Sequence, residues 1–202
     1  MTATVRDRTA RPLVVACGAL ARELRAVLEG AGLADELDVQ YLPSHLHNRP
    51  EQIAPAIEAL LRAAGDRRCV VAYADCGTGG ALDRVLRQFP GVVRLPGAHC
   101  YEVFAGSDLF AALHDSEPGT FYLTDYLALH FDALVWDGLG LGRHPELRDQ
   151  YFAHYTRVAL LAQSDDTAVD IAARRAAERL GLAYERVFVG RGELAAIIAG
   201  AV

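Results

Sequence analysis

The chain has 202 residues, of which 52% are hydrophobic and 23% charged, and its formal net charge is −6. This predicts a globular protein with a sizeable core, and the acidic balance argues against a general nucleic-acid binder. No apolar run approaches the roughly 20 residues of a membrane span, and the polar start is not typical of a secretory signal, so we expect a cytoplasmic protein. All 20 basic residues are arginine. Lysine Schiff-base chemistry and a Walker-type phosphate loop are therefore excluded.

Short apolar runs alternate with amphipathic patterns along the first half of the chain. The runs predict strands at residues 13–16, 37–42, 69–74 and 92–95. Apolar residues at helical spacing predict helices at residues 20–28, 50–64, 81–88 and 100–113. Gly30 and Gly65 are expected to end the first two helices.

The second half continues the alternation. Residues 120–132 indicate a short strand or turn and then a helix, which 133–136 could extend. Helices are predicted at 145–155, 166–180 and 193–201, and strands at 157–162 and 184–189. The alternation predicts an α/β fold, with a mainly parallel, Rossmann-like central sheet that has helices on both faces. We expect a frayed tail at 1–11 and a single α/β domain over 12–202.

Three of the four cysteines share one kind of position. Cys17 and Cys76 follow predicted strands and precede glycines, and Cys100 follows a strand after a short turn. Parallel strands send all such turns to one edge of the sheet, where ligands bind, so we expect three thiols to converge there as metal ligands. Cys69 opens a strand, seven residues before Cys76. This odd separation points the two side chains to opposite faces, so Cys69 is expected to be structural.

Several polar residues near these cysteines are candidates for acid–base work. His99 and Glu102 flank Cys100, and Asp75 directly precedes Cys76, so these three are the expected catalytic residues. His45 and His47 lie in a loop after the second predicted strand. Whether His45, His47 or His99 ligates the metal is left open.

Two glycine-rich segments could bind an anion. Gly77, Thr78, Gly79 and Gly80 follow a strand and open a helix, so their backbone amides could approach a phosphate or carboxylate. Arg143 ends a second such segment and could clamp an anion with two hydrogen bonds. The expected substrate is therefore a small molecule that could carry an anionic group. The alternatives are that the first segment is a tight strand-to-helix turn, and that the polar residues of the second cap a helix or face solvent.

Taken together, these motifs resemble the prokaryotic family catalogued as domain of unknown function 1638. The resemblance runs from about Pro12 to Ala199, and it is carried by residues 16–20, 46–50, 75–80, 96–102, 121–130 and 139–151. It implies an association with corrinoid-dependent methyltransferase components, and hence one-carbon chemistry with a corrinoid protein as partner. It implies no catalytic residue.

The leading hypothesis is a metal-dependent enzyme with a three-cysteine site, such as a corrinoid-linked methyltransferase. Three thiolates could hold zinc with an open fourth position, or a [4Fe–4S] cluster with one open iron, as in a lyase or hydrolase-type enzyme. Zinc is slightly favoured, because His99 lies next to Cys100 and mixed nitrogen and sulfur ligation suits zinc. The alternatives are a non-catalytic metal- or corrinoid-binding accessory protein and a metal-free enzyme with Cys76 as nucleophile. The sequence does not distinguish a monomer from a homo-oligomer.

Overall fold

The computed structural model describes residues 11–201. Apart from Arg11, the tail expected at 1–11 lies outside the described residues. The chain divides into two compact units. The first unit runs up to Val103 and includes the segment from Glu193 onward, and the second unit is Phe104–Gly192. Each unit contains its own sheet and is described by itself.

The sheet of the first unit has four strands, and all of its paired strands are parallel. They are β1 (Leu13–Cys17), β2 (Asp38–Leu42), β3 (Cys69–Ala72) and β4 (Val93–Arg94), in the spatial order β2-β1-β3-β4. Every residue of β1 and β3 is buried, whereas the residues of β2 and β4 are partly or fully exposed. The continuous apolar runs of the sequence are therefore the central strands, which are covered on both faces.

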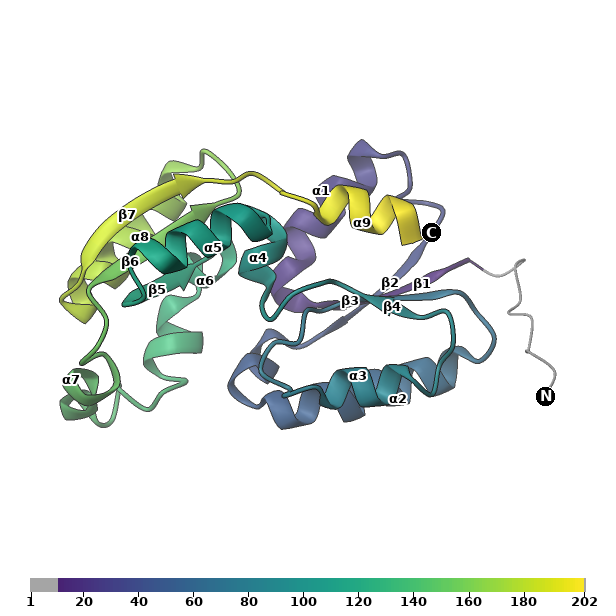
Figure 1. The fold of residues 1–202 in the computed structure, drawn as a ribbon, viewed down its shortest axis with the longest axis horizontal. Coiled ribbons are helices and arrows are strands. Elements are labelled where there is room, and N and C mark those ends of the chain that lie inside the picture. Colours follow the sequence, from purple (N-terminus) through teal and green to yellow (C-terminus); the bar gives the residue numbers. More distant parts are fainter. Residues whose placement is uncertain (1–10, 202) are drawn as a thin grey trace. The chain divides into compact units, whose positions relative to one another are not determined.

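Helices cover both faces of this sheet. Figure 1 shows α1 (Ala21–Gly30) and α9 (Leu194–Ala201) on one side of it, and α2 (Ile53–Ala64) and α3 (Ala81–Leu86) on the other. In α2 the buried residues Ile53, Ile57 and Leu61 recur at every fourth position, so they form the stripe that faces the core. A short helix, α4 (Cys100–Ala105), begins at the third cysteine.

The second unit holds a three-stranded parallel sheet in the order β5-β6-β7. Its strands are β5 (Thr120–Leu123), β6 (Arg157–Ala162) and β7 (Ala183–Phe188). Its helices are α5 (Ser107–Ser116), α6 (Asp125–Leu129), α7 (Arg148–Tyr151) and α8 (Thr167–Leu180), and a π-helical turn spans Asp132–Trp136. Asp166 caps α8 by accepting a hydrogen bond from the Ala168 N–H at 2.9 Å.

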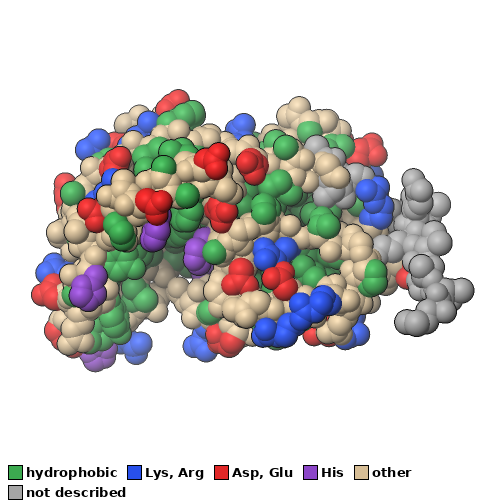
Figure 2. Space-filling model, in the orientation of Figure 1, with side chains coloured by type: hydrophobic (Ala, Val, Ile, Leu, Met, Phe, Trp, Pro, Cys, Tyr) green, Lys and Arg blue, Asp and Glu red, His purple; other side chains and the backbone are tan. Residues whose placement is uncertain are grey.

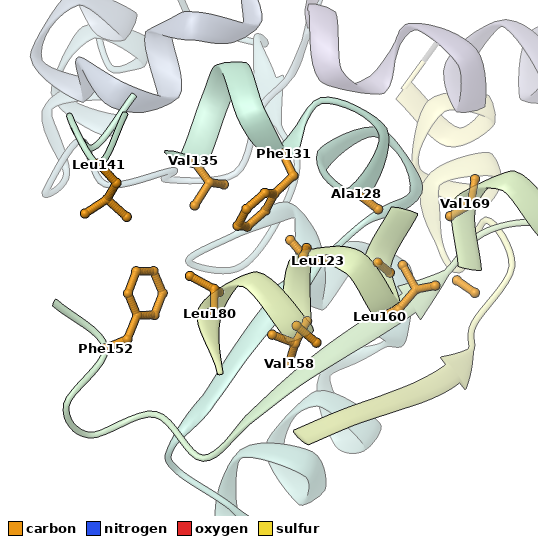
Figure 3. Close-up of a cluster of buried hydrophobic side chains, with 14 residues drawn as sticks. Leu123, Ala128, Phe131, Val135, Leu141, Phe152, Val158, Leu160, Val169 and Leu180 are labelled. Atoms are coloured by element: carbon orange, nitrogen blue, oxygen red, sulfur yellow. The ribbon is translucent and has the colours of Figure 1, made fainter. Parts of the chain in front are cut away.

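The core of the second unit forms between its sheet and the helices α6 and α8. Figure 3 shows Phe131 and Val135, which follow α6 in the chain, and Leu180 of α8 packed around Leu123 and Val158. Neighbouring residues of a strand point to opposite faces, so Tyr122 leaves this core. Its ring lies 5.1 Å from the ring of Phe110 on α5.

The predicted α/β fold with mainly parallel, Rossmann-like strands and helices is confirmed. The structure differs from the expected single central sheet, because β4 and β5 are separated by two helices and belong to different sheets. Hydrophobic periodicity predicts strands but does not say which strands pair. The helix expected at 100–113 is broken at Gly106, which has a φ of 77° between α4 and α5. The helix expected at 145–155 is reduced to a 3₁₀ turn and α7.

Charges of both signs are mixed over the surface. On the face seen in Figure 2, arginine and acidic side chains are interspersed over both units. Many of them are paired, as in the ion pairs Arg67–Asp38, Arg94–Asp83 and Arg157–Glu185. Of the helices between residues 11 and 201, none combines the length and apolar character that a membrane span requires.

Candidate functional site

The candidate site lies at the carboxyl edge of the first sheet. The chain leaves β1 toward β2 on one side, and then crosses back to β3 on the other side, so a topological switch point falls between β1 and β3. Ligands of open parallel sheets bind at such points. Cys17 is the last residue of β1, and Tyr73 directly follows β3.

Cys17 is held by two polar neighbours. Its sulfur accepts a hydrogen bond from the Ala19 N–H at 3.4 Å, and it lies 3.6 Å from Nε2 of His47. His47 belongs to the 3₁₀ turn Ser44–Asn48 that follows β2. A Cβ at Gly18 would lie 3.0 Å from the Leu42 carbonyl oxygen, so this glycine allows the turn after β1 to pass close to the end of β2. This close approach brings His47 to Cys17.

Cys76 and Cys100 are brought together by backbone pairing beyond the strands. The Asp75 N–H donates to the Gly97 carbonyl oxygen at 3.2 Å, and the Cys76 N–H donates to the Ala98 carbonyl oxygen at 2.8 Å. The loop that leads to α4 therefore runs beside the segment that follows β3. The Cys76 sulfur in turn accepts a hydrogen bond from the Cys100 N–H.

Burial and mutual interaction keep the three thiols protonated. Burial raises the pKa of Cys76 to about 12, with a further contribution from Cys17. Burial also raises the pKa of Cys17, and it raises that of Cys100 well above its ordinary value, with further contributions from Cys76 and Cys17. The three sulfur atoms thus lie near enough for the ionisation of one to oppose that of another. A cation among them would reverse this preference, since a coordinating thiol is deprotonated outright.

Tyr73 adds a buried hydroxyl to this group. The residue is 1% exposed, and its hydroxyl makes no hydrogen bond of normal geometry within residues 11–201. It nonetheless interacts with Cys17 and Cys76, and burial followed by these two thiols raises the pKa of Tyr73 strongly. An unpaired buried hydroxyl costs roughly 1–3 kcal/mol. The site therefore contains a buried hydroxyl whose neighbours are thiols, which are weak hydrogen-bond acceptors.

The side chains do not form a metal cage as they stand. In the described part of the chain, no three His, Cys, Asp or Glu side chains are arranged as a set of metal ligands. Metal binding by Cys17, Cys76 and Cys100 would therefore require these residues to rearrange. Cys17 ends β1, whereas Cys76 lies in the loop after β3 and Cys100 opens α4 after β4.

Cys76 has a strained backbone. Its φ of 50° is positive, and it is the one non-glycine residue between 11 and 201 with this conformation. For a residue with a Cβ the left-handed region costs roughly 1–2 kcal/mol. Such strain is typical of functional sites, because the surrounding structure must maintain it.

We expect Cys76→Gly to be more stable than Cys76→Ala by about 1 kcal/mol, since only glycine adopts a positive φ without a Cβ penalty. Chemical denaturation of the two metal-free variants measures the difference. Both variants lack the thiol, so metal binding does not enter the comparison. A Cys76→Ala variant at least as stable as Cys76→Gly would contradict the assigned strain.

The glycine-rich loop after Cys76 already holds an anion, which is the carboxylate of Asp75. Its two oxygens accept hydrogen bonds from the Thr78 hydroxyl at 2.7 Å, the Gly80 N–H at 2.9 Å and the Gly79 N–H at 3.1 Å. The Thr78 N–H bonds to the Asp75 carbonyl oxygen at 3.0 Å. A substrate anion at Gly77–Gly80 would have to displace Asp75. The interpretation of this segment as a tight turn is therefore the one that the geometry favours, and Asp75 braces that turn.

The hydrogen bond from Thr78, followed by those from Gly80 and Gly79, lowers the pKa of Asp75 from its ordinary value of 3.8. A lowered folded-state pKa stabilises the fold above the unfolded-state pKa, and this contribution is lost as pH falls through the folded-state value. We expect Asp75→Ala to cost about 1 kcal/mol at neutral pH, as loss of a cap does. The stability difference from the unsubstituted protein should shrink below pH 3.8, as measured by urea unfolding. A difference independent of pH would contradict this role.

The remaining predicted residues occupy more open positions. His99 is exposed, and its proximity adds to burial in lowering the pKa of His47. Glu102 is half-buried, packs over Gly97 and accepts a hydrogen bond from the Ala98 N–H at 3.3 Å. His45 is exposed. Arg143 is exposed and belongs to the second unit. The structure therefore associates His47, rather than His45, with the cysteines.

Cys69 lies at the amino end of β3, where it pairs with Leu13. It is 4% exposed, and its thiol donates a hydrogen bond to the Arg67 carbonyl oxygen at 3.5 Å. The fourth cysteine is thus at the opposite end of the strand from Cys76. Tyr73 is the residue that sequence reasoning missed, although a polar aromatic residue at the end of an apolar run is the signal that could have identified it.

Comparison with known proteins gives one result. No curated protein and no solved structure matches the chain. The model of a family described as "Protein of unknown function (DUF1638)" matches residues 41–198, which include His47, Tyr73, Cys76 and Cys100. Since the match covers most of the chain, this protein belongs to the DUF1638 family.

Proposed function

We propose that this protein is a metal-dependent enzyme whose metal is held by the thiolates of Cys17, Cys76 and Cys100. The observation that supports this most is the mutual interaction of three thiols, each following a different strand of the first sheet. Cys17 and Cys76 are buried and Cys100 is half-buried. A reducing compartment such as the cytoplasm would keep them free for a metal. The buried hydroxyl of Tyr73, which makes no hydrogen bond of normal geometry with the described residues, fits a site that becomes complete only with a bound group.

Zinc and a [4Fe–4S] cluster both suit three thiolates. Zinc is slightly favoured, because His47 lies beside Cys17 and its pKa is lowered by burial, so its imidazole is neutral and able to ligate. When bound with an open position, either centre supplies a Lewis acid to a substrate. Methyl transfer with a corrinoid protein as partner is the reaction class that the family resemblance suggests. A centre closed by His47 would instead fit a metal-carrying accessory protein.

Metal and sulfide analysis of anaerobically purified protein tests the proposal. We expect about one zinc per chain in a colourless protein, or iron with acid-labile sulfide in a brown one. Cys69→Ser is the matched control and should keep the full metal content. The absence of any metal after anaerobic purification and reconstitution would contradict the proposal.

A second candidate function is a metal-free thiol enzyme, and the contact between Cys17 and His47 favours it. The imidazole lies 3.6 Å from the thiol and, being neutral, could accept its proton. This candidate predicts one thiol that is alkylated rapidly by iodoacetamide, at the same rate with and without a chelator. The metal proposal predicts instead that a chelator increases the labelling of all three cysteines together.

A further inference from the structure

The starting observation is the hydroxyl of Tyr73. It projects from the segment directly after β3, on the strand that neighbours β1, whose last residue is Cys17. The residue is 1% exposed, so its hydroxyl is shielded from bulk solvent, and no described residue hydrogen-bonds to it with normal geometry. Buried hydroxyl groups are nearly always paired, so this exception calls for an explanation.

The sulfur of Cys17 offers an explanation for this hydroxyl. Tyr73 and Cys17 already interact, but a neutral thiol is a weak hydrogen-bond acceptor. A thiolate carries the charge that makes a hydrogen bond shorter and about twice as strong. The hydroxyl is thus positioned to hydrogen-bond to Cys17 once the thiol has lost its proton and become a thiolate.

We infer that Tyr73 is a positioning residue of the thiol site, which donates a hydrogen bond from its hydroxyl to the sulfur of Cys17 when that sulfur is a thiolate. This inference rests on the proposed function, because metal binding is what would make the thiolate permanent. The same interaction orients the Cys17 side chain, since the tyrosine ring is enclosed by the core.

Tyr73→Phe tests the inference, because it removes only the hydroxyl. The probe is cobalt(II), titrated into metal-free reduced protein under anaerobic conditions. We expect the variant to bind cobalt about 10-fold to 100-fold more weakly, as is typical when a group bonded to a ligand is lost. We also expect its sulfur-to-cobalt charge-transfer absorption to shift to longer wavelength, because the loss of a hydrogen bond raises the energy of the sulfur lone pairs.

The matched control is Tyr122→Phe. Tyr122 is also a buried tyrosine, at 7% exposure, but its unit contains no cysteine. Its substitution should leave cobalt affinity and absorption unchanged. A structural role for the Tyr73 hydroxyl predicts a lower melting temperature of metal-free Tyr73→Phe. Our inference predicts an equal or higher one, since an unpaired buried hydroxyl is removed.

The outcomes separate this inference from the proposed function. Equal cobalt affinity and identical absorption in Tyr73→Phe would overturn the inference and leave the metal site intact. If the unsubstituted protein binds no cobalt, the proposed function fails, and the inference is then judged by the rate at which iodoacetamide labels Cys17 at one fixed pH. A slower rate in Tyr73→Phe would support the hydrogen bond, and an unchanged rate would overturn it.

Discussion

Replacement of Cys17, Cys76 or Cys100 by serine is expected to reduce metal affinity by about 100-fold or more. Loss of a residue that hydrogen-bonds to a metal ligand typically reduces affinity by about 10-fold to 100-fold, and loss of the ligand itself should have a larger effect. Each substitution removes one of three thiolates and leaves a hydroxyl that is far harder to ionise. The three variants should behave alike, since each thiol follows a different strand and the fourth cysteine, Cys69, lies at the amino end of β3. Metal content after anaerobic reconstitution measures the effect.

Cys69→Ser controls for the loss of a buried thiol. Cys69 is as buried as Cys17, at 4% exposure, but it lies at the amino end of its strand. It should lose stability without losing metal. If one of the three site variants binds metal normally, His47 is the residue to replace next, because it lies 3.6 Å from the Cys17 sulfur. Loss of metal in Cys69→Ser alone would contradict the whole assignment.

Asp125→Ala should destabilise the second unit by about 3 kcal/mol, because it leaves several buried partners unsatisfied. Asp125 is 1% exposed, and its carboxylate accepts hydrogen bonds from the Gln163 N–H at 2.9 Å and the Ser164 hydroxyl at 2.6 Å. The Gln163 side-chain oxygen in turn accepts from the Asp125 N–H at 2.7 Å. This reciprocal pair fastens the start of α6 to the end of β6.

The matched comparison is Ser164→Ala, which removes one donor and should cost only about 1 kcal/mol. Differential scanning calorimetry of both variants gives the two values. Metal content should be unchanged in each, since Asp125 and Ser164 lie in the unit without cysteines. A loss below about 1 kcal/mol for Asp125→Ala would mean that water replaces the carboxylate, and that the network is not tightly enclosed.

Most elements of the fold could be predicted from hydrophobic periodicity. The strand over 157–162 matches β6 residue for residue, because a largely apolar segment of 6 residues bounded by polar residues has the length of a strand and is too short for a typical helix. The two-sheet arrangement could not be predicted in this way, since it depends on which strands pair. Gly106 shows a second limit, because a single glycine with a φ of 77° divides a helical pattern that is otherwise continuous.

The grouping of the three cysteines could be predicted from the parallel topology of the strands. Parallel topology sends every strand end to the same edge, which is why Cys17, Cys76 and Cys100 could be considered together from sequence. The use of Asp75 as an internal anion could not be foreseen, because its bonds to Gly79 and Gly80 depend on the shape of the turn. The contribution of His47 depends on the close approach at Gly18, which is also a tertiary feature.

X-ray absorption spectroscopy of the anaerobically reconstituted protein tests the central claim most directly, since it reports which atoms surround the metal. The account predicts a shell of about three sulfur atoms at about 2.3 Å if the metal is zinc, unchanged in Cys69→Ser and depleted in Cys17→Ser. A shell of oxygen and nitrogen alone, in a protein whose cysteines are reduced, would contradict it.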